Sequence, residues 1–147
     1  MATHSVTSNP SLVNNVVNGV IGGAAGGVVF GIMMGVQGML PMVAALIGAN
    51  DALVGFVVHM AISVFIGVTF GVIASRLPSG LPLRTIGGGV YGIVWWVLGA
   101  LILMPLMLGM NEMVFVIGEM QISSLIGHLI FGVIMGVVYH FMAARRA

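Results

Sequence analysis

Long apolar runs separated by short polar segments dominate the pattern of this chain. A transmembrane helix needs roughly 20 mostly apolar residues, and four stretches reach that length: 12–39, 52–75, 85–108 and 122–144. The strands of a membrane barrel are about ten residues long and alternate apolar with polar residues, which these runs do not. The pattern therefore predicts an all-α, polytopic protein with four transmembrane helices.

Residues that end or begin helices lie between the runs. Pro41 has no amide hydrogen and disfavours helix at the residue before it. Asp51 follows Asn50 and is a plausible N-cap for the second helix. A short turn with two prolines, residues 76–82, separates the second run from the third. Pro105 and the polar segment 109–112 end the third run.

The two halves of the chain resemble each other. Residues 27–32 match residues 88–93, an offset of 61. Small and polar residues recur every four positions in both even-numbered helices: Gly55, His59, Ser63, Gly67, Gly71 and Ser75, then Ser124, His128, Gly132, Gly136, His140 and Ala144. This predicts a tandem repeat of two helical hairpins, at about 12–76 and 84–144, in one domain over 12–147 after a short tail, 1–11.

The composition excludes most soluble functions. Of the 147 residues, 60% are hydrophobic and 5% are charged, whereas about 25% are charged in soluble domains. A water-soluble enzyme, a nucleic-acid-binding protein and a disordered segment are therefore excluded. The chain has no cysteine, which excludes disulfides, thiolate metal sites and iron–sulfur clusters. A lipid bilayer is the expected surrounding.

The few charges predict an orientation. All four arginines lie in the turn at 76–84 or at the C-terminus, and the three acidic residues lie in the other two loops. Arginine accumulates on the cytoplasmic side of membranes. We therefore expect both termini in the cytoplasm. The first eleven residues contain no Lys or Arg, so we expect no cleaved secretory signal.

Stripes of glycine predict close helix packing. The candidates are Gly19, Gly23, Gly27, Gly31, Gly35, Gly67, Gly71, Gly132 and Gly136. Apolar burial alone does not bring helices together in lipid, but backbone contact over small residues does. The stripes indicate packing within the chain or between copies, so we expect a homo-oligomer or a subunit of a larger membrane complex. The alternative is that the glycines leave room for a flat cofactor or a pore.

His59 and His128 are the candidate functional residues, because ionisable groups inside a membrane are expensive. Both lie on the small-residue stripes, at nearly equal depth in the outer half of the bilayer. Three roles are open: local hydrogen bonding by a neutral ring, ligation of a haem b between the second and fourth helices, or part of a metal, proton or solute pathway. No cofactor is required by the sequence, and the 13 methionines are interpreted as flexible apolar filler.

A broad group of small, four-helix prokaryotic membrane proteins of unknown function resembles this chain over residues 12–144. Residues 104–107 (MPLM) and 127–132 (GHLIFG) carry the resemblance, together with the hairpin repeat. The resemblance implies the four-span fold and a place in the inner membrane of a prokaryotic cell, and it implies no activity. No acidic residue lies within a span, so we expect a non-catalytic protein. A structural or accessory subunit of a bioenergetic complex is our first hypothesis, a haem b electron carrier the second, and a small oligomeric channel or permease the third.

Overall fold

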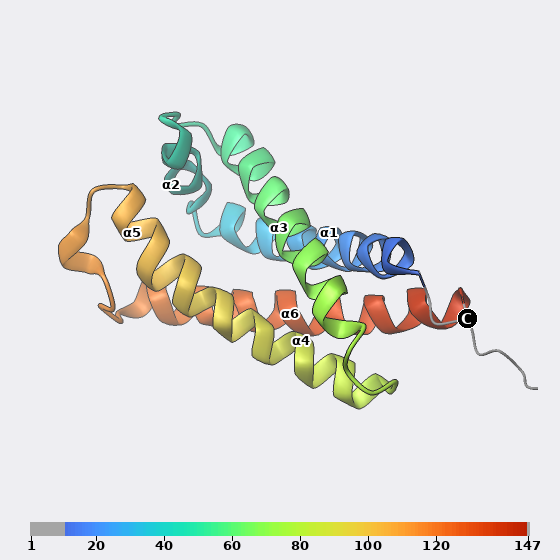
Figure 1. Ribbon diagram of the computed structural model, residues 1–147. Coiled ribbons are helices and arrows are strands. Elements are labelled where there is room, and N and C mark those ends of the chain that lie inside the picture. The colour runs from blue at the N-terminus through green and yellow to red at the C-terminus, as the bar shows by residue number, and fades with distance from the viewer. Residues whose placement is uncertain (1–10, 147) are drawn as a thin grey trace, which may run out of the picture.

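Four long helices run in alternating directions through residues 11–146, the part of the chain that this computed structural model describes (Figure 1). Three are continuous α-helices: α1 (Leu12–Val36), α3 (Ala52–Ala74) and α6 (Glu119–Arg145). The remaining span, Leu81–Met107, joins α4 (Leu81–Trp95), the π-helical segment η2 (Trp96–Leu103) and α5 (Met104–Met107). All four are long and apolar enough to cross a membrane, and the described residues contain no strand. The prediction of an all-α, four-span membrane protein is confirmed.

The helix ends follow from local chemistry. The Ser11 hydroxyl accepts a hydrogen bond from the Asn14 amide at 3.3 Å, and the Asp51 carboxylate accepts one from the Val54 amide at 3.0 Å. Both are N-cap bonds, which satisfy amide groups that a helix leaves unpaired at its start. Pro82 occupies the first turn of α4, where a missing amide hydrogen is harmless. The third span therefore begins at Leu81, four residues before the predicted start.

Short helices connect the long ones at the end of the bundle opposite the C-terminus (Figure 1). After α1 the chain forms α2 (Leu40–Ala44) and the 3-10 helix η1 (Ala45–Ile47), and after α5 it forms the 3-10 helix η3 (Asn111–Met113). Gly38 and Gly109 have φ angles of +69° and +71°, a region where glycine carries no steric penalty. These glycines turn the chain out of α1 and α5 toward the short helices.

Glycine contacts hold the helices together in two close pairs, α1 with α3 and α4 with α6. Gly19 and Gly67 meet so closely that a Cβ atom on either one would overlap the carbonyl oxygen of the other. Gly88 and Gly132 meet in the same way. A second glycine row on α1 brings α6 onto its other face, where a Cβ on Gly26 would lie 2.6 Å from the Phe131 carbonyl oxygen. Helix α1 therefore lies between α3 and α6.

The tandem repeat stays a prediction, and the glycine contacts point to a different register from the one that the sequence suggested. Gly19 and Gly88 occupy corresponding places and lie 69 positions apart, not 61. Gly67 and Gly132 correspond at an offset of 65, which would match His59 with Ser124 rather than with His128. Small residues every four positions allow several registers that differ by one turn, and only the backbone contacts distinguish them.

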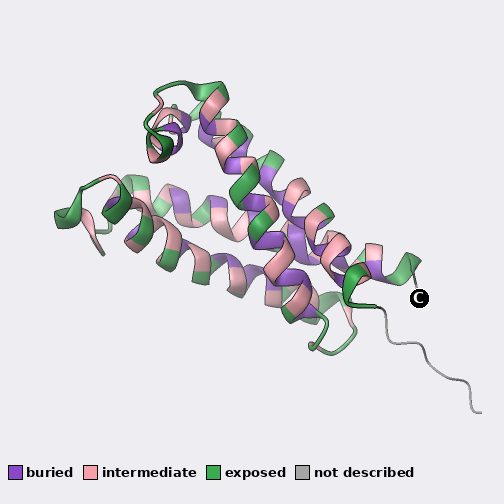
Figure 2. Ribbon diagram, turned by 45° about the horizontal axis from the view of Figure 1, so that its top comes forward, coloured by how far each residue is buried: buried purple, intermediate pink, exposed green. Residues whose placement is uncertain are grey.

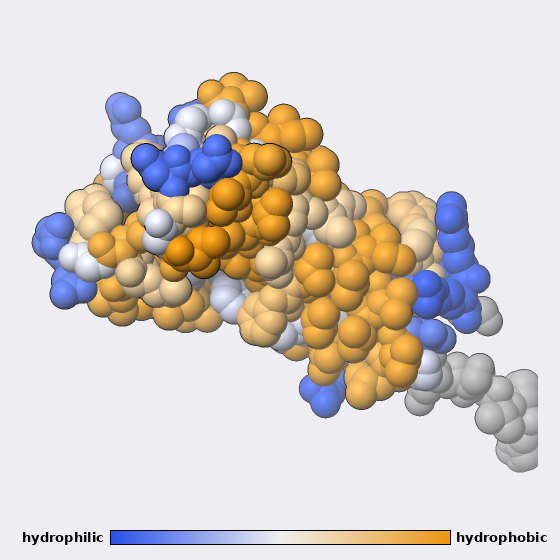
Figure 3. Space-filling view, turned by 90° about the horizontal axis from the view of Figure 1, so that it is seen from above, coloured by the Kyte–Doolittle hydropathy of each residue, from blue (hydrophilic) through white to orange (hydrophobic). Residues whose placement is uncertain are grey.

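Apolar side chains fill the centre and also cover the outside. Phe70, Phe131, Met135 and Tyr139 are almost completely buried, and the Tyr139 hydroxyl donates to the Asn15 side-chain oxygen at 3.0 Å. Buried residues follow the inner faces of the long helices in Figure 2. Figure 3 shows a broad hydrophobic surface across the middle of the molecule and hydrophilic residues toward its ends. This surface is suited to contact with the lipid bilayer.

Candidate functional site

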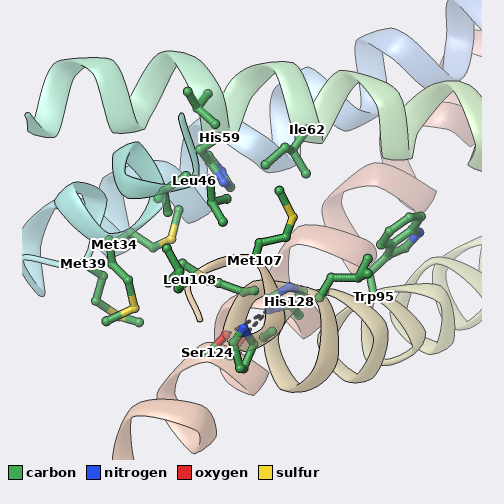
Figure 4. A pocket seen from close by; sticks show the side chains of 18 of the residues that line it. Met34, Met39, Leu46, His59, Ile62, Trp95, Met107, Leu108, Ser124 and His128 are labelled. Carbon is green, nitrogen blue, oxygen red and sulfur yellow. Dashed lines mark hydrogen bonds between the residues drawn. The ribbon is translucent and has the colours of Figure 1, made fainter. Parts of the chain in front are cut away.

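A cavity of about 910 Å³ opens between α3, the third span and the short helix α2 (Figure 4). It lies in the half of the bundle that carries α2, η1 and η3, away from the C-terminus (Figure 1). Ligand sites in proteins typically enclose 300–1,000 Å³ and are mostly apolar with a few polar groups. This cavity has both properties, and it is the candidate site.

Methionines form much of the cavity wall. Eight of the 13 methionines line it: Met34, Met39, Met42, Met104, Met107, Met110, Met113 and Met120. They come from α1, α2, α5, η3 and α6 and from the segments beside these helices. Methionine side chains are unbranched and polarisable and adapt to irregular shapes, so this wall can adjust to more than one apolar guest. They were interpreted from the sequence as filler, and the structure places most of them around a space.

His59 lies on α3, and its ring reaches across to α1. Its Nε2 atom donates a hydrogen bond to the Gly27 carbonyl oxygen at 2.9 Å, and the Ser63 hydroxyl lies 3.4 Å from the same nitrogen. The approach depends on glycine, since a Cβ on Gly31 would be 3.2 Å from the His59 Cδ2 atom. A carbonyl oxygen can only accept, so Nε2 carries the hydrogen and, in a neutral ring, Nδ1 keeps a lone pair.

His128 lies on α6 and is bonded within its own helix. Its Nδ1 atom donates to the Ser124 carbonyl oxygen at 2.8 Å, and the Ser124 hydroxyl is 3.3 Å from that nitrogen. In a neutral ring the lone pair is therefore on Nε2. Both histidines line the cavity (Figure 4). Both histidines therefore make a hydrogen bond to a backbone carbonyl oxygen.

The aromatic ring of Phe30 packs against both imidazoles. Its centroid lies 5.3 Å from that of His59 and 4.9 Å from that of His128, and both contacts are edge-to-face. Phe30 is itself held by α6, where a Cβ on Gly127 would overlap its ring. A haem ligated by both histidines would have to displace this ring and would find Nε2 of His59 already bonded to α1. The geometry does not favour the haem b alternative.

The predicted packing glycines lie mostly where helices meet inside the chain. Gly19 and Gly23 face Gly67 and Gly71 across the α1–α3 contact, and Gly132 and Gly136 face α4. Gly27 and Gly31 make room for Ser63, Phe56 and His59. Gly35 differs from the prediction, because it is exposed and its Cβ would meet only a Leu40 methyl group at 3.5 Å. The stripe ends there because the axes of α1 and α3 diverge toward the cavity (Figure 1).

Sequence reasoning missed the part of the third span that faces the cavity. Trp95, Gly99 and Ala100 line it, and η2, which contains the latter two, is π-helical. Single π-helical turns occur frequently at functional sites. The neighbouring Trp96 is buried and donates through Nε1 to the Gln121 carbonyl oxygen at 2.9 Å. In the sequence, Met39, Met42, Met104, Met107 and Met110 fall near the same end of their spans, and this cluster was the one signal that pointed to the region.

The charged residues do not gather at the site. Among residues 11–146, no three His, Asp or Glu side chains come close enough together to hold a metal ion. Glu119 reaches the cavity rim, while Asp51 caps α3. The site is therefore an apolar chamber with two imidazoles and a few neutral polar groups.

Residues 13–147 match a family described as "Family of unknown function (DUF6789)". The chain belongs to this family. The DUF6789 match covers nearly the whole chain, including every helix and every residue of the cavity, and it agrees with the resemblance to a group of small proteins without an established activity. No curated protein and no solved structure matches the chain.

Proposed function

We propose that this protein is a non-catalytic, intramembrane binding protein that holds a lipophilic small molecule in the cavity beside His59 and His128. One observation carries the proposal: a chamber of about 910 Å³, walled mainly by methionine and other apolar side chains, is lined by all four spans and by the connecting segments at one end of the bundle. A cavity with such a wall excludes ions and strongly polar solutes, because it offers them too few partners. It suits a molecule that already dissolves in lipid.

The way into the cavity is sideways from the bilayer. Along the α3–α4 side, the two helices touch through few side chains, chiefly a hydrogen bond of 2.7 Å between the Thr69 and Tyr91 hydroxyls and an edge contact between Phe65 and Trp95. The cavity lies beyond this contact, toward α2 and α5, where both helices line it. A lipid-soluble guest would enter there without crossing water.

A role as an accessory subunit fits this proposal better than a channel does. The protein would present or store a lipophilic guest for a larger membrane complex, or for a homo-oligomer of itself, in a prokaryotic inner membrane. The glycine stripes support packing mainly inside the chain, so such a complex would form on other surfaces. A channel would need a continuous polar path, and the apolar wall gives no support to one.

A photoreactive alkane tests the proposal directly. The protein, reconstituted in lipid nanodiscs, is irradiated with a diazirine-bearing alkane, and the labelled residues are mapped by mass spectrometry. We expect labels concentrated on cavity residues such as Met104 and Met107. Filling the cavity with Gly99→Phe should remove most of this labelling, since a Cβ on Gly99 meets nothing within 4 Å and the added ring can enter the space.

Leu98→Phe is the matched control, because Leu98 is on the same π-helical segment, is exposed, and does not line the cavity. It should leave the labelling of Met104 and Met107 unchanged. Labels spread evenly over lipid-facing residues, with no effect of Gly99→Phe, would show that the cavity holds no guest.

A further inference from the structure

The polar groups that line the cavity restrict which chemical groups a bound molecule should carry. Each histidine uses one ring nitrogen to donate to a backbone carbonyl, at 2.9 Å for His59 and 2.8 Å for His128. These bonds fix the tautomers, because the carbonyl oxygens can only accept. In an apolar surrounding the uncharged ring is much less costly than the charged one. The other nitrogen of each ring, Nδ1 of His59 and Nε2 of His128, is then a hydrogen-bond acceptor.

Nothing within residues 11–146 donates to these two nitrogens. The Ser63 and Ser124 hydroxyls are close only to the nitrogens that already donate, at 3.4 and 3.3 Å. The indole hydrogen of Trp96 is bonded to the Gln121 carbonyl oxygen. Both imidazoles line the cavity (Figure 4). The site thus presents acceptors that a guest must satisfy or leave unpaired.

We propose that the cavity recognises a lipophile whose head donates hydrogen bonds, such as an alcohol, a phenol or a quinol, with an apolar body among the methionines. This inference rests on the proposed function and names the class of its ligand. An apolar guest without a donor would bury the imidazole nitrogens unpaired, and an unsatisfied buried acceptor is costly. A site that pairs with a hydroxyl group therefore prefers the guest that carries it over the analogue that lacks it.

The place of the head group follows from Phe30. Its ring packs edge-on against both imidazoles, with centroid distances of 5.3 and 4.9 Å. A head group that binds beside Phe30 would therefore lie close to both imidazole rings. The apolar body would extend past Trp95 and Gly99 toward the methionines of α5 and η3, where the wall adapts to its shape.

The test compares a long-chain 4-alkylphenol with its methyl ether, which differs only in the donor. Each compound competes with the photoreactive alkane in nanodiscs, and its concentration is corrected for partitioning into protein-free nanodiscs. We expect the phenol to compete about fivefold more strongly, the ratio that corresponds to one hydrogen bond of about 1 kcal/mol. The corresponding alkylquinone, whose head only accepts, should compete no better than the ether.

The variant His59→Phe/His128→Phe removes both acceptors and keeps ring-shaped side chains. The phenol and the ether should then compete equally, while labelling of Met104 by the alkane shows that the cavity is intact. If the double variant does not fold, His128→Phe alone serves, because the His128 bond stays within α6; the preference should then fall. Equal competition by the two compounds in the unmodified protein overturns this inference and leaves the proposed function standing. Absence of cavity labelling by the alkane overturns both.

Discussion

At the scale of single residues, the closest contacts in this protein are between glycines, and they are contacts between backbones. Gly19 lies on Gly67, and Gly88 lies on Gly132, with each carbonyl oxygen where the other residue's Cβ would be. A side chain can rotate away from an added methyl group, but a helix backbone cannot. The two helices would have to separate along their length.

We therefore predict that Gly67→Ala and Gly132→Ala each lower the free energy of unfolding by about 1–3 kcal/mol, the usual cost of overpacking. Gly35→Ala is the control, because an added Cβ there makes only an ordinary contact with Leu40. It should be neutral or slightly stabilising, since alanine favours helix by about 1 kcal/mol over glycine. The measurement is unfolding in mixed micelles with increasing denaturing detergent. Equal stability of all three variants would mean that the helix backbones at Gly67 and Gly132 are far enough from their neighbours to accept a methyl group.

The two histidines show why the site was harder to predict than the fold. His59 and His128 are recognisable in the sequence because ionisable groups are rare in spans. The partners that come from another helix, the Gly27 carbonyl and the Phe30 ring, are not recognisable in the sequence. Which turn of α1 faces His59 depends on the register of two glycine stripes, and that register differs by one turn between equally plausible alignments.

At the scale of elements, the third span is tied to the loop that follows it. Pro105 has no amide hydrogen, so the Leu101 carbonyl, four residues earlier, cannot receive the usual α-helical bond. The Phe115 amide donates to that carbonyl at 3.1 Å. Phe115 has a φ angle of +59°, an uncommon conformation for a bulky residue. The bond holds the loop after α5 against the span, next to the methionine wall.

Pro105→Ala supplies an amide hydrogen that competes with Phe115 for the Leu101 carbonyl. We predict faster amide hydrogen exchange at Phe115, by roughly fivefold for a weakened bond of about 1 kcal/mol. Pro82→Ala is the control, because Pro82 occupies the first turn of α4. No helical carbonyl precedes this turn, so the added amide hydrogen competes with no existing bond. Amide hydrogen exchange is measured by mass spectrometry on the reconstituted protein. An unchanged exchange rate at Phe115 would contradict the proposed role of its hydrogen bond to Leu101.

Helices and their ends were largely predictable from the sequence, and the connecting segments were not. Apolar length alone located all four spans, and Asp51 capped α3 as expected. Pro82 was interpreted as part of a turn, although proline favours the first turn of a helix as much. The cavity depends on the segments after Pro41 and Pro105, whose short helices fold back beside α3 and η2. No periodicity marks such segments, because they are too short to show one.

At the scale of the whole molecule, four spans place both described ends of the bundle on one side (Figure 1). Arg145 and Arg146 lie at this end, together with Arg76 in the turn after α3 and Arg84 in the first turn of α4. We predict that this side faces the cytoplasm, following the usual distribution of arginine. The expected tail, residues 1–11, lies outside the described residues except for Ser11.

Single cysteines test this orientation, since the natural chain has none. A cysteine at Ala147 should resist an impermeant thiol reagent in intact cells and react fully after lysis. A cysteine at Asn50, in the loop before α3, should react in both conditions. Labelling of Ala147→Cys from outside, with protection of Asn50→Cys, would reverse the topology and place the cavity in the cytoplasmic half of the membrane.

The position of α1 between α3 and α6 sets an order of events during biosynthesis. This helix leaves the ribosome before the other three described spans, and its face toward α3 is covered soon afterwards, when the adjacent span follows. Its other face, at Gly22 and Gly26, packs against Met135 and Phe131, which are made roughly 100 residues later; at 5–20 residues per second that interval is roughly 5–20 seconds. During that time the glycine groove on α1 is exposed to lipid or to any neighbouring helix in the insertion machinery. Helix α6 must then displace the lipid or helix that occupies this groove.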